Sequence, residues 1–228
     1  MPKINKYNLQ ARIFPTILCV LPLLIFQYFF INEQIAIFLK YLGGVEFVGN
    51  VAISSASIYF VSQVNRIISK TFFEKSLEYM PTTNLLLFSN SEYSRSHKKK
   101  IYSKLERDFE VRLPNGKEQD ENELDSRKRI SEVVGLAKKR VGEGKLLLQH
   151  NIEYGFWRNF LGGSTLGVVF SFIDIYFSYK IENNSVLAIS SVLLLCYALS
   201  LIFSKFIINK VSDNYARVLF EEYLESNH

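Results

Sequence analysis

Rows of polar side chains interrupt stretches of the sequence that are otherwise strongly apolar. In one stretch, Glu46, Asn50, Ser54 and Ser57 recur at every third or fourth residue. At about 100° per helical residue these positions lie within about 80° of one another on one helix face. Polar groups face lipid only at a high cost in free energy, so such a face must contact other helices or water. Two further rows are Gly163, Gly167, Ser171, Asp174 and Ser178, and, less regularly, Ser190, Tyr197 and Ser204.

These rows allow two interpretations. One is helix packing, because small residues let helices approach closely and Gly163-x-x-x-Gly167 is a small-xxx-small pattern. The other is a cavity or pore that the rows line when several copies assemble, exposed only in an open state. In a pore, Glu46 and Asp174 would favour cations near the outer mouth. Both acids also lie close enough to a helix end to reach interfacial water without any role in conduction.

The sequence contains no pattern typical of catalysis or metal binding. It lacks a glycine-rich phosphate loop and a nucleophile elbow, and its three histidines, His97, His150 and His228, are not spaced as zinc ligands. Cys19 and Cys196 lie within apolar runs and are typical of small packing residues. We therefore expect no enzyme activity, no catalytic, cofactor-binding or metal-binding residue, no cofactor and no small-molecule substrate.

Four apolar stretches carry these rows: 13–31, 45–63, 160–178 and 186–208. Nineteen helical residues cover roughly 28 Å, close to the roughly 30 Å hydrocarbon core of a bilayer. The second and third stretches each contain an acid, so an alternative has only the first and fourth as true spans. The first stretch could be a signal peptide, but it is long and lacks a small-residue cleavage pattern, which favours a retained anchor.

Lysine and arginine predict the orientation. Residues 1–12 hold three, 64–158 hold nineteen and the tail from Ser204 holds three, whereas the two connectors hold only Lys40 and Lys180. Positive flanks stay in the cytoplasm. We therefore predict an all-α polytopic protein of the bacterial inner membrane, with both termini cytoplasmic and two transmembrane hairpins flanking a helical cytoplasmic insert. Its parts are a cytoplasmic N-terminus (1–12), the first hairpin (13–63), the helical insert (64–159), the second hairpin (160–208) and a cytoplasmic tail (209–228).

The insert shows helical periodicity in three places. Helices are predicted from Ser94 to Phe109, from Glu123 to about Val141, and from Leu146 onwards into the third span. Residues 117–125 are acidic and predict a flexible segment. The basic run His97-Lys98-Lys99-Lys100 indicates either a solvated helix face near anionic lipid or a nucleic-acid contact. We expect the insert to hold little core of its own.

Two motifs of the insert carry a resemblance. Met80-Pro81-Thr82-Thr83-Asn84-Leu85-Leu86, followed by Arg112-Leu113-Pro114, and Asn151-Ile152-Glu153-Tyr154-Gly155-Phe156-Trp157-Arg158-Asn159 resemble elements of a group of bacterial membrane proteins. The group shares P-T-T-x-x-L and N-x-x-Y-G-F-x-R-N elements around a soluble insert. The motif residues lie at the two ends of the insert, where we expect a joint between soluble helices and spans, and Arg158 is suited to lipid phosphate. They are Pro81, Thr82, Thr83, Tyr154, Gly155, Phe156, Arg158 and Asn159.

In size and layout the chain also looks like the transmembrane effectors of retron anti-phage systems. That resemblance implies a reverse transcriptase and its RNA–DNA hybrid as partners, and membrane damage in the infected cell as the outcome. The sequence hypothesis is therefore a membrane-disrupting, toxin-like effector of a bacterial anti-phage system, a retron acting by abortive infection. It would contact membrane lipid and form a homo-oligomer. The alternative is a membrane-anchored binding or scaffold module that recruits a cytoplasmic partner. A small transporter or constitutive channel comes third.

Overall fold

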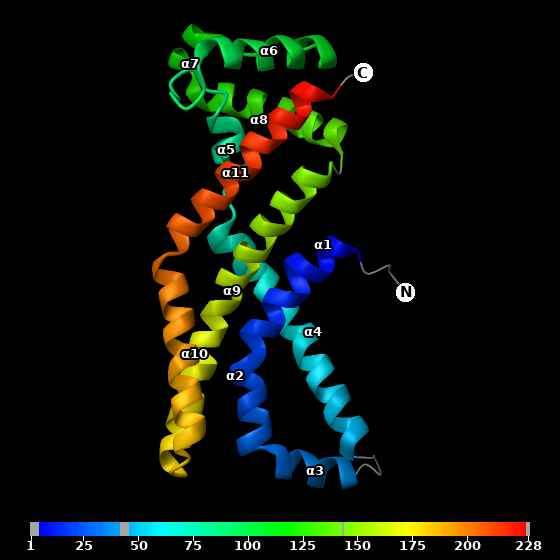
Figure 1. Ribbon diagram of the computed structural model, residues 1–228, viewed down its shortest axis with the longest axis vertical. Coiled ribbons are helices and arrows are strands. Elements are labelled where there is room, and N and C mark those ends of the chain that lie inside the picture. The colour runs from blue at the N-terminus through cyan, green and yellow to red at the C-terminus, as the bar shows by residue number, and fades with distance from the viewer. Residues whose placement is uncertain (1–4, 42–45, 143, 227–228) are drawn as a thin grey trace. The chain divides into compact units, whose positions relative to one another are not determined.

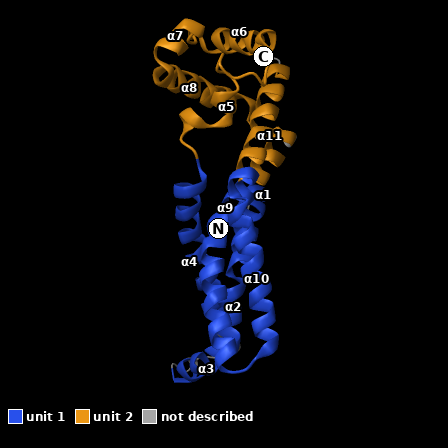
Figure 2. Ribbon diagram, turned by 90° about the vertical axis from the view of Figure 1, so that its left-hand side faces the viewer, with its two compact units in different colours: residues 1–74, 155–207 blue, residues 75–154, 208–228 orange. Residues whose placement is uncertain are grey.

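The described part of the chain is built from helices alone. The computed structural model describes residues 5–41, 46–142 and 144–226, and no strand occurs within these ranges (Figure 1). The all-α prediction is confirmed. The chain divides into two compact units: unit 1 comprises residues 1–74 and 155–207, and unit 2 comprises residues 75–154 and 208–228 (Figure 2).

Within the described residues, three helical segments are long and apolar enough to cross a membrane. They are Lys6–Phe30, Leu146–Lys180 and Asn184–Ile202. The first, third and fourth predicted stretches therefore have spanning character. The second predicted stretch lies in α4 (Glu46–Phe73), which has 28 residues but is not among the three. The side chains at the start of α4 lie outside the described part of the structure, so the spanning character of this stretch, and with it the four-span topology, stays a prediction.

Unit 1 contains most of the apolar helices. The segment Lys6–Phe30 consists of α1 (Lys6–Asn8), a π-helical turn (Leu9–Ile13) and α2 (Phe14–Phe30). The helix α3 (Asn32–Tyr41) runs across between the ends of α2 and α4 (Figure 1), where the sequence had indicated only a connector. α9 (Lys145–Lys180) and α10 (Asn184–Ile202) complete the unit from residue 155 onwards.

Aromatic rings and one hydroxyl join α2 to α9 and α10. Phe26 meets Phe177 edge-on at 5.3 Å between ring centroids. The Tyr197 hydroxyl of α10 donates a hydrogen bond of 2.6 Å to the Leu18 carbonyl of α2. This bond links the side chain of one helix to the backbone of the other. These contacts connect segments that are far apart in the sequence. The apolar helices of unit 1 therefore pack as one bundle.

Unit 2 has a hydrophobic core of its own, contrary to the expectation of little core. It contains a 3-10 turn (Leu77–Tyr79), α5 (Pro81–Asn84), α6 (Arg95–Phe109), α7 (Gly116–Glu121), α8 (Glu123–Val141) and most of α11 (Ser204–Glu225). α6 and α8 lie where the periodicity predicted them. The buried core residues are Leu85, Leu86, Leu87, Ile101, Tyr102, Leu105, Leu113, Ile130, Val133, Val134, Ala137, Leu147, Tyr215, Ala216, Val218, Leu219, Phe220 and Tyr223.

The expectation of little core was wrong because the C-terminal segment is a packed helix and not a tail. Residues from Ser204 to Glu225 form the helix α11, and it contributes Tyr215, Leu219 and Tyr223 to the core of unit 2. Apolar side chains recur there at helical spacing, so α11 adds a further apolar face to those of the charged helices α6 and α8. A chain segment that follows the last span thus stabilises the unit.

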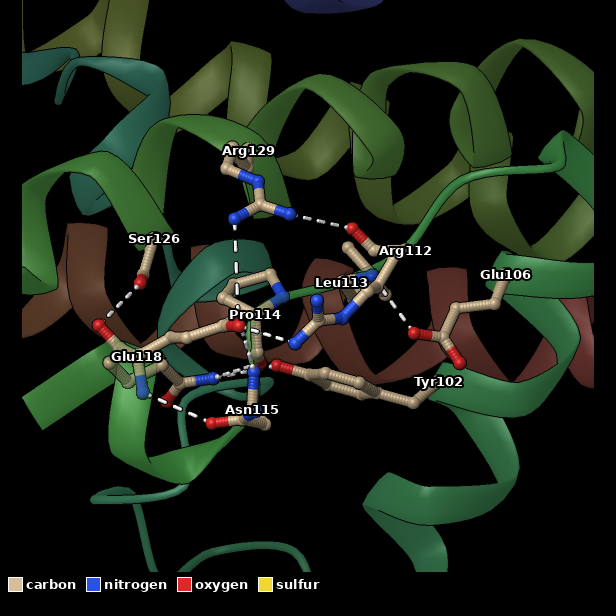
Figure 3. A network of polar contacts seen from close by, with 10 residues as sticks. Tyr102, Glu106, Arg112, Leu113, Pro114, Asn115, Glu118, Ser126 and Arg129 are labelled. Carbon is tan, nitrogen blue, oxygen red and sulfur yellow. Dashed lines mark hydrogen bonds and ion pairs between the residues drawn. The ribbon is translucent and has the colours of Figure 1, made fainter.

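The segment 117–125 is also more ordered than its acidic composition indicated. α7 begins with a capping box, in which Asn115 Oδ1 accepts from the Glu118 amide at 3.1 Å and Glu118 Oε2 accepts from the Asn115 amide at 3.2 Å (Figure 3). Next to it, the Gln119 side-chain amide donates to the Tyr102 hydroxyl at 2.9 Å and to the Pro114 carbonyl at 3.1 Å. Burial raises the pKa of Tyr102. This network holds the turn before α7 against α6.

Candidate functional site

The polar row of α9 is buried in unit 1. Ser171, Asp174 and Ser178 have no exposed area, and neither has Ser190 of α10. Ser190 lies close enough to Asp174 for a weak polar contact, but its geometry falls short of a hydrogen bond. Two helices thus enclose one carboxyl group and three hydroxyl groups. We call these four residues the Asp174 cluster.

The Asp174 cluster is not satisfied by hydrogen bonds. Neither carboxylate oxygen of Asp174 has a hydrogen-bond partner among the described residues, nor have the hydroxyls of the three serines. A buried polar group without a partner costs about 1–3 kcal/mol, and an ionised carboxylate costs more. Three hydroxyls could donate to a carboxylate or coordinate a cation beside it. The arrangement therefore has the composition of a cation or proton site, enclosed between α9 and α10.

The row of α4 is described only in part. Ser54 is half-buried, and its hydroxyl accepts a hydrogen bond of 3.3 Å from the Gln27 side-chain amide of α2. The side chains of Glu46 and Asn50 lie outside the described part of the structure. Ser54 therefore joins two helices, as the packing interpretation predicts for that position. The predicted place of Glu46 near the outer mouth of a pore, like that of Asp174, stays a prediction.

The glycines of α9 are packing positions. A Cβ at Gly163 would lie 2.6 Å from the Cys19 sulfur, and one at Gly167 would lie 2.8 Å from the Tyr197 ring. At Gly162, which the sequence analysis did not single out, a Cβ would lie 2.9 Å from the Ser69 Cα of α4. Close approach at three glycines is the small-residue packing expected for membrane helices. The row of α9 thus combines packing at one end with the unsatisfied Asp174 cluster at the other.

The second motif of the resemblance lies at the start of the apolar part of α9. A Cβ at Gly155 would lie 2.9 Å from that of Ala11, and the Asn159 side-chain amide donates to the Ala11 carbonyl at 2.6 Å. Arg158 forms a salt bridge of 2.8 Å with Glu74. Phe156 stacks on Phe160 with centroids 6.0 Å apart. Gly155, Arg158 and Asn159 thus join α9 to other segments of unit 1, whereas Phe156 stacks within α9. Tyr154, the last residue of this stretch in unit 2, is half-buried.

The first motif lies in unit 2, where Pro81, Thr82 and Thr83 begin α5 and are all buried. The Thr83 hydroxyl donates to the Leu77 carbonyl at 2.8 Å. Asn84, the last residue of α5, accepts a hydrogen bond of 2.6 Å from Arg127 of α8. The motif therefore positions a short helix against α8. The first motif lies in unit 2 and residues 155–159 of the second motif lie in unit 1, and each has an evident packing role in its own unit.

The basic run of α6 divides into a buried and an exposed part. Lys98 is 1% exposed, and its ammonium donates to the carbonyls of Leu87 and Asn90. Burial lowers the pKa of Lys98. Lys98 is thus a structural residue of the turn after α5. An open groove of about 510 Å³ lies along α6, lined by Ser96, Lys99, Lys100, Ser103, Lys104, Arg107 and Leu224.

Sequence reasoning missed two buried polar residues of unit 1. Asn65 and Ser69 of α4 are linked by a hydrogen bond of 2.9 Å, and Asn65 donates to the Thr16 hydroxyl of α2 at 3.4 Å. Two polar residues four positions apart share one helix face, so the sequence could have indicated a polar contact between α4 and another helix at Asn65 and Ser69. No group of three or more potential metal ligands occurs in the part of the chain that the structure describes.

Comparisons with known proteins add no relative to this picture. No protein-family profile, no curated protein and no solved structure matches the chain.

Proposed function

We propose that this protein is a membrane-permeabilising protein of the bacterial inner membrane, with both termini in the cytoplasm, and that it conducts cations along α9 and α10. The observation that carries the proposal is the Asp174 cluster. A carboxylate enclosed between two apolar helices without a hydrogen-bond partner lowers the stability of the closed bundle. Such groups in membrane helices are typical of ion and proton pathways.

In the proposed mechanism the described arrangement is the closed one. Ser171, Asp174, Ser178 and Ser190 have no exposed area, so water has no access to them in a single closed copy. When α10 separates from α9, or copies assemble, the four polar side chains line a hydrated path. Asp174 then attracts cations, and the hydroxyls replace part of their hydration shell. Enzyme activity plays no part in this proposal.

We place this activity in anti-phage defence, as the effector of a retron that acts by abortive infection. This setting rests on the likeness of layout given above. A reverse transcriptase with its RNA–DNA hybrid would be the partner that holds the effector closed, and a homo-oligomer in membrane lipid would be its active form.

A second function is favoured by a specific observation in unit 2. The groove beside α6 is lined by Lys99, Lys100, Lys104 and Arg107 and by no acidic residue. Such a groove suits an acidic surface, so the protein could be a membrane-anchored module that recruits an acidic cytoplasmic partner. In that case the spans serve only as an anchor and the Asp174 cluster has no role in conduction.

Expression in cells distinguishes the two functions. Wild-type protein should depolarise the inner membrane and stop growth, as a potential-sensitive dye reports. Asp174→Asn should depolarise much more slowly, because it keeps the shape of the side chain and removes its charge. Glu33→Gln is the matched control: Glu33 is an exposed acid of α3, in the same unit and outside the cluster. Unchanged potential with verified membrane insertion of the wild type would favour the anchor.

A further inference from the structure

Three boundary segments of unit 1, far apart in the sequence, meet around one small hollow. Arg12 lies in the π-helical turn before α2, Arg66 lies in the second half of α4, and Arg158 precedes the apolar part of α9. Each arginine lies within three residues of the end of an apolar stretch: Arg12 and Arg158 precede one, and Arg66 follows one. The hollow has a volume of about 70 Å³, and its lining also includes Thr16, Asn65 and Asn159.

The polar walls of the hollow are buried and held in place. Thr16 and Asn65 are each 1% exposed. The Thr16 hydroxyl donates to the Arg12 carbonyl at 2.8 Å and accepts from Asn65 at 3.4 Å. Asn159 is fixed by its hydrogen bond to the Ala11 carbonyl. Side chains that are already oriented lose little entropy when a ligand binds, so the hollow is preorganised.

The charge of the hollow is strongly positive. Three guanidinium groups line it and no acidic side chain does. Arg158 is paired with Glu74, which lies outside the lining. Arg12 stacks on the Tyr7 ring at 5.4 Å, and neither Arg12 nor Arg66 forms a salt bridge within the described residues. Two arginine charges therefore have no acidic counterpart at the hollow.

The size and chemistry select one kind of ligand. A water occupies about 30 Å³ in the liquid, so the hollow admits a group of only a few heavy atoms. Guanidinium forks match the oxygens of a phosphate group in geometry and in charge. We propose that the hollow binds a single phosphate group, which Arg12 and Arg66 contact and which the polar wall orients. A phospholipid headgroup and a free phosphate both present this group.

Binding would have a structural consequence for unit 1. The ligand would neutralise arginines contributed by the segments around α2, α4 and α9, and would thereby hold these three helices together at the polar boundary. The site differs from the Asp174 cluster in its residues and in its ligand. Phosphate binding can therefore be tested without measuring conduction, and it does not depend on the proposed function.

The test measures binding to full-length protein purified in maltoside micelles. One arm titrates radiolabelled inorganic phosphate in equilibrium dialysis. The other uses native mass spectrometry with phosphatidylglycerol, and with diacylglycerol of the same chains as the phosphate-free lipid. Arg66→Gln is the main variant, because Arg66 is exposed and its loss leaves no salt bridge broken. Arg12→Gln is the second variant. Lys70→Gln is the matched control: Lys70 is exposed, one turn further along α4 and outside the hollow.

We expect saturable binding of at least one phosphate probe and none of diacylglycerol. Arg66→Gln and Arg12→Gln should each weaken it by about tenfold, the lower range for a charge-assisted hydrogen bond. Lys70→Gln should change it less than twofold. Binding of phosphatidylglycerol alone identifies the source as lipid, and binding of inorganic phosphate identifies a soluble source. No binding of either probe, or an equal loss in Lys70→Gln, would overturn the proposal.

Discussion

Among single residues, Asp108 at the end of α6 shows how unit 2 stabilises buried charge. Its carboxylate accepts a hydrogen bond of 2.9 Å from the Tyr223 hydroxyl of α11 and lies 3.5 Å from Arg140 of α8. Burial alone would raise the pKa of Asp108, but the hydrogen bonds from Tyr223 and Arg107 and the charge of Arg140 together lower it. One carboxylate thereby joins three helices that are distant in the sequence.

The lowered pKa predicts how the stability of unit 2 depends on pH. A carboxyl group with a lower pKa in the folded state stabilises that state above its unfolded pKa of about 3.9, and loses this contribution as the pH falls through the folded value. At pH 7, Asp108→Asn should reduce the free energy of opening of α6 and α11 by about 1–3 kcal/mol. Hydrogen exchange followed by mass spectrometry measures this.

The difference between the wild type and Asp108→Asn should shrink as the pH is lowered below 4. Asp120→Asn is the control, because Asp120 is an exposed acid of α7 in the same unit. A pH-independent difference, or an equal loss in Asp120→Asn, would show that the charge of Asp108 does not stabilise the unit.

At the scale of elements, the sequence predicted those helices whose periodicity is complete within one segment. α6 has its apolar residues at Ile101, Tyr102 and Leu105, and both α6 and α8 were located within about one residue. α11 was missed because its apolar face follows a span and resembles a charged tail. α7 was not predicted because its acidic composition is typical of a flexible segment, although the Asn115–Glu118 capping box is a helix-start signal. In both cases a usable local signal was present.

The candidate sites were predictable to different degrees. The row of Ser171 and Asp174 followed from spacing alone, because helical geometry determines which residues share a face. The position of Ser190 next to Asp174 could not be predicted in this way, because it depends on how α10 packs against α9 and not on spacing within one helix. The hollow at Arg12, Arg66 and Arg158 could not be predicted, because it forms only when three distant boundary segments meet.

Glycines provide a prediction at the scale of helix packing. At Gly167 a Cβ would lie 2.8 Å from the Tyr197 ring, and this ring is held by the hydrogen bond from its hydroxyl to Leu18. Gly167→Ala should therefore destabilise unit 1 by about 1 kcal/mol or more. Gly135 of α8 has nothing within 4 Å of a Cβ, so Gly135→Ala should stabilise unit 2 by about 0.5–1 kcal/mol.

Thermal unfolding in micelles, combined with hydrogen exchange in each unit, measures both effects. The two substitutions should change the free energy of unfolding in opposite directions. Both replace a helical glycine, but only the site of Gly135 has room for a methyl group. Equal stabilisation by both would mean that α9 does not approach α10 closely at Gly167.

At the scale of the whole molecule, the chain combines apolar helices with a separately packed helical unit. Three segments have spanning character, and unit 2 has its own core built from α5, α6, α8 and α11. The spans would be sufficient as an anchor if they were uniformly apolar. Asp174 departs from that pattern, because its carboxylate is enclosed without a hydrogen-bond partner among the described residues. We propose that this charge serves cation conduction.

Potassium release from vesicles tests that claim most directly. Purified protein is inserted into phosphatidylglycerol and phosphatidylethanolamine vesicles loaded with potassium chloride, and potassium and chloride release are followed with ion-selective electrodes. The wild type should release potassium faster than chloride, and Asp174→Asn should slow potassium release by about tenfold, equivalent to about 1.4 kcal/mol in barrier. Glu33→Gln should release potassium at the wild-type rate. Potassium release by Asp174→Asn at the wild-type rate, with equal insertion, would contradict the account.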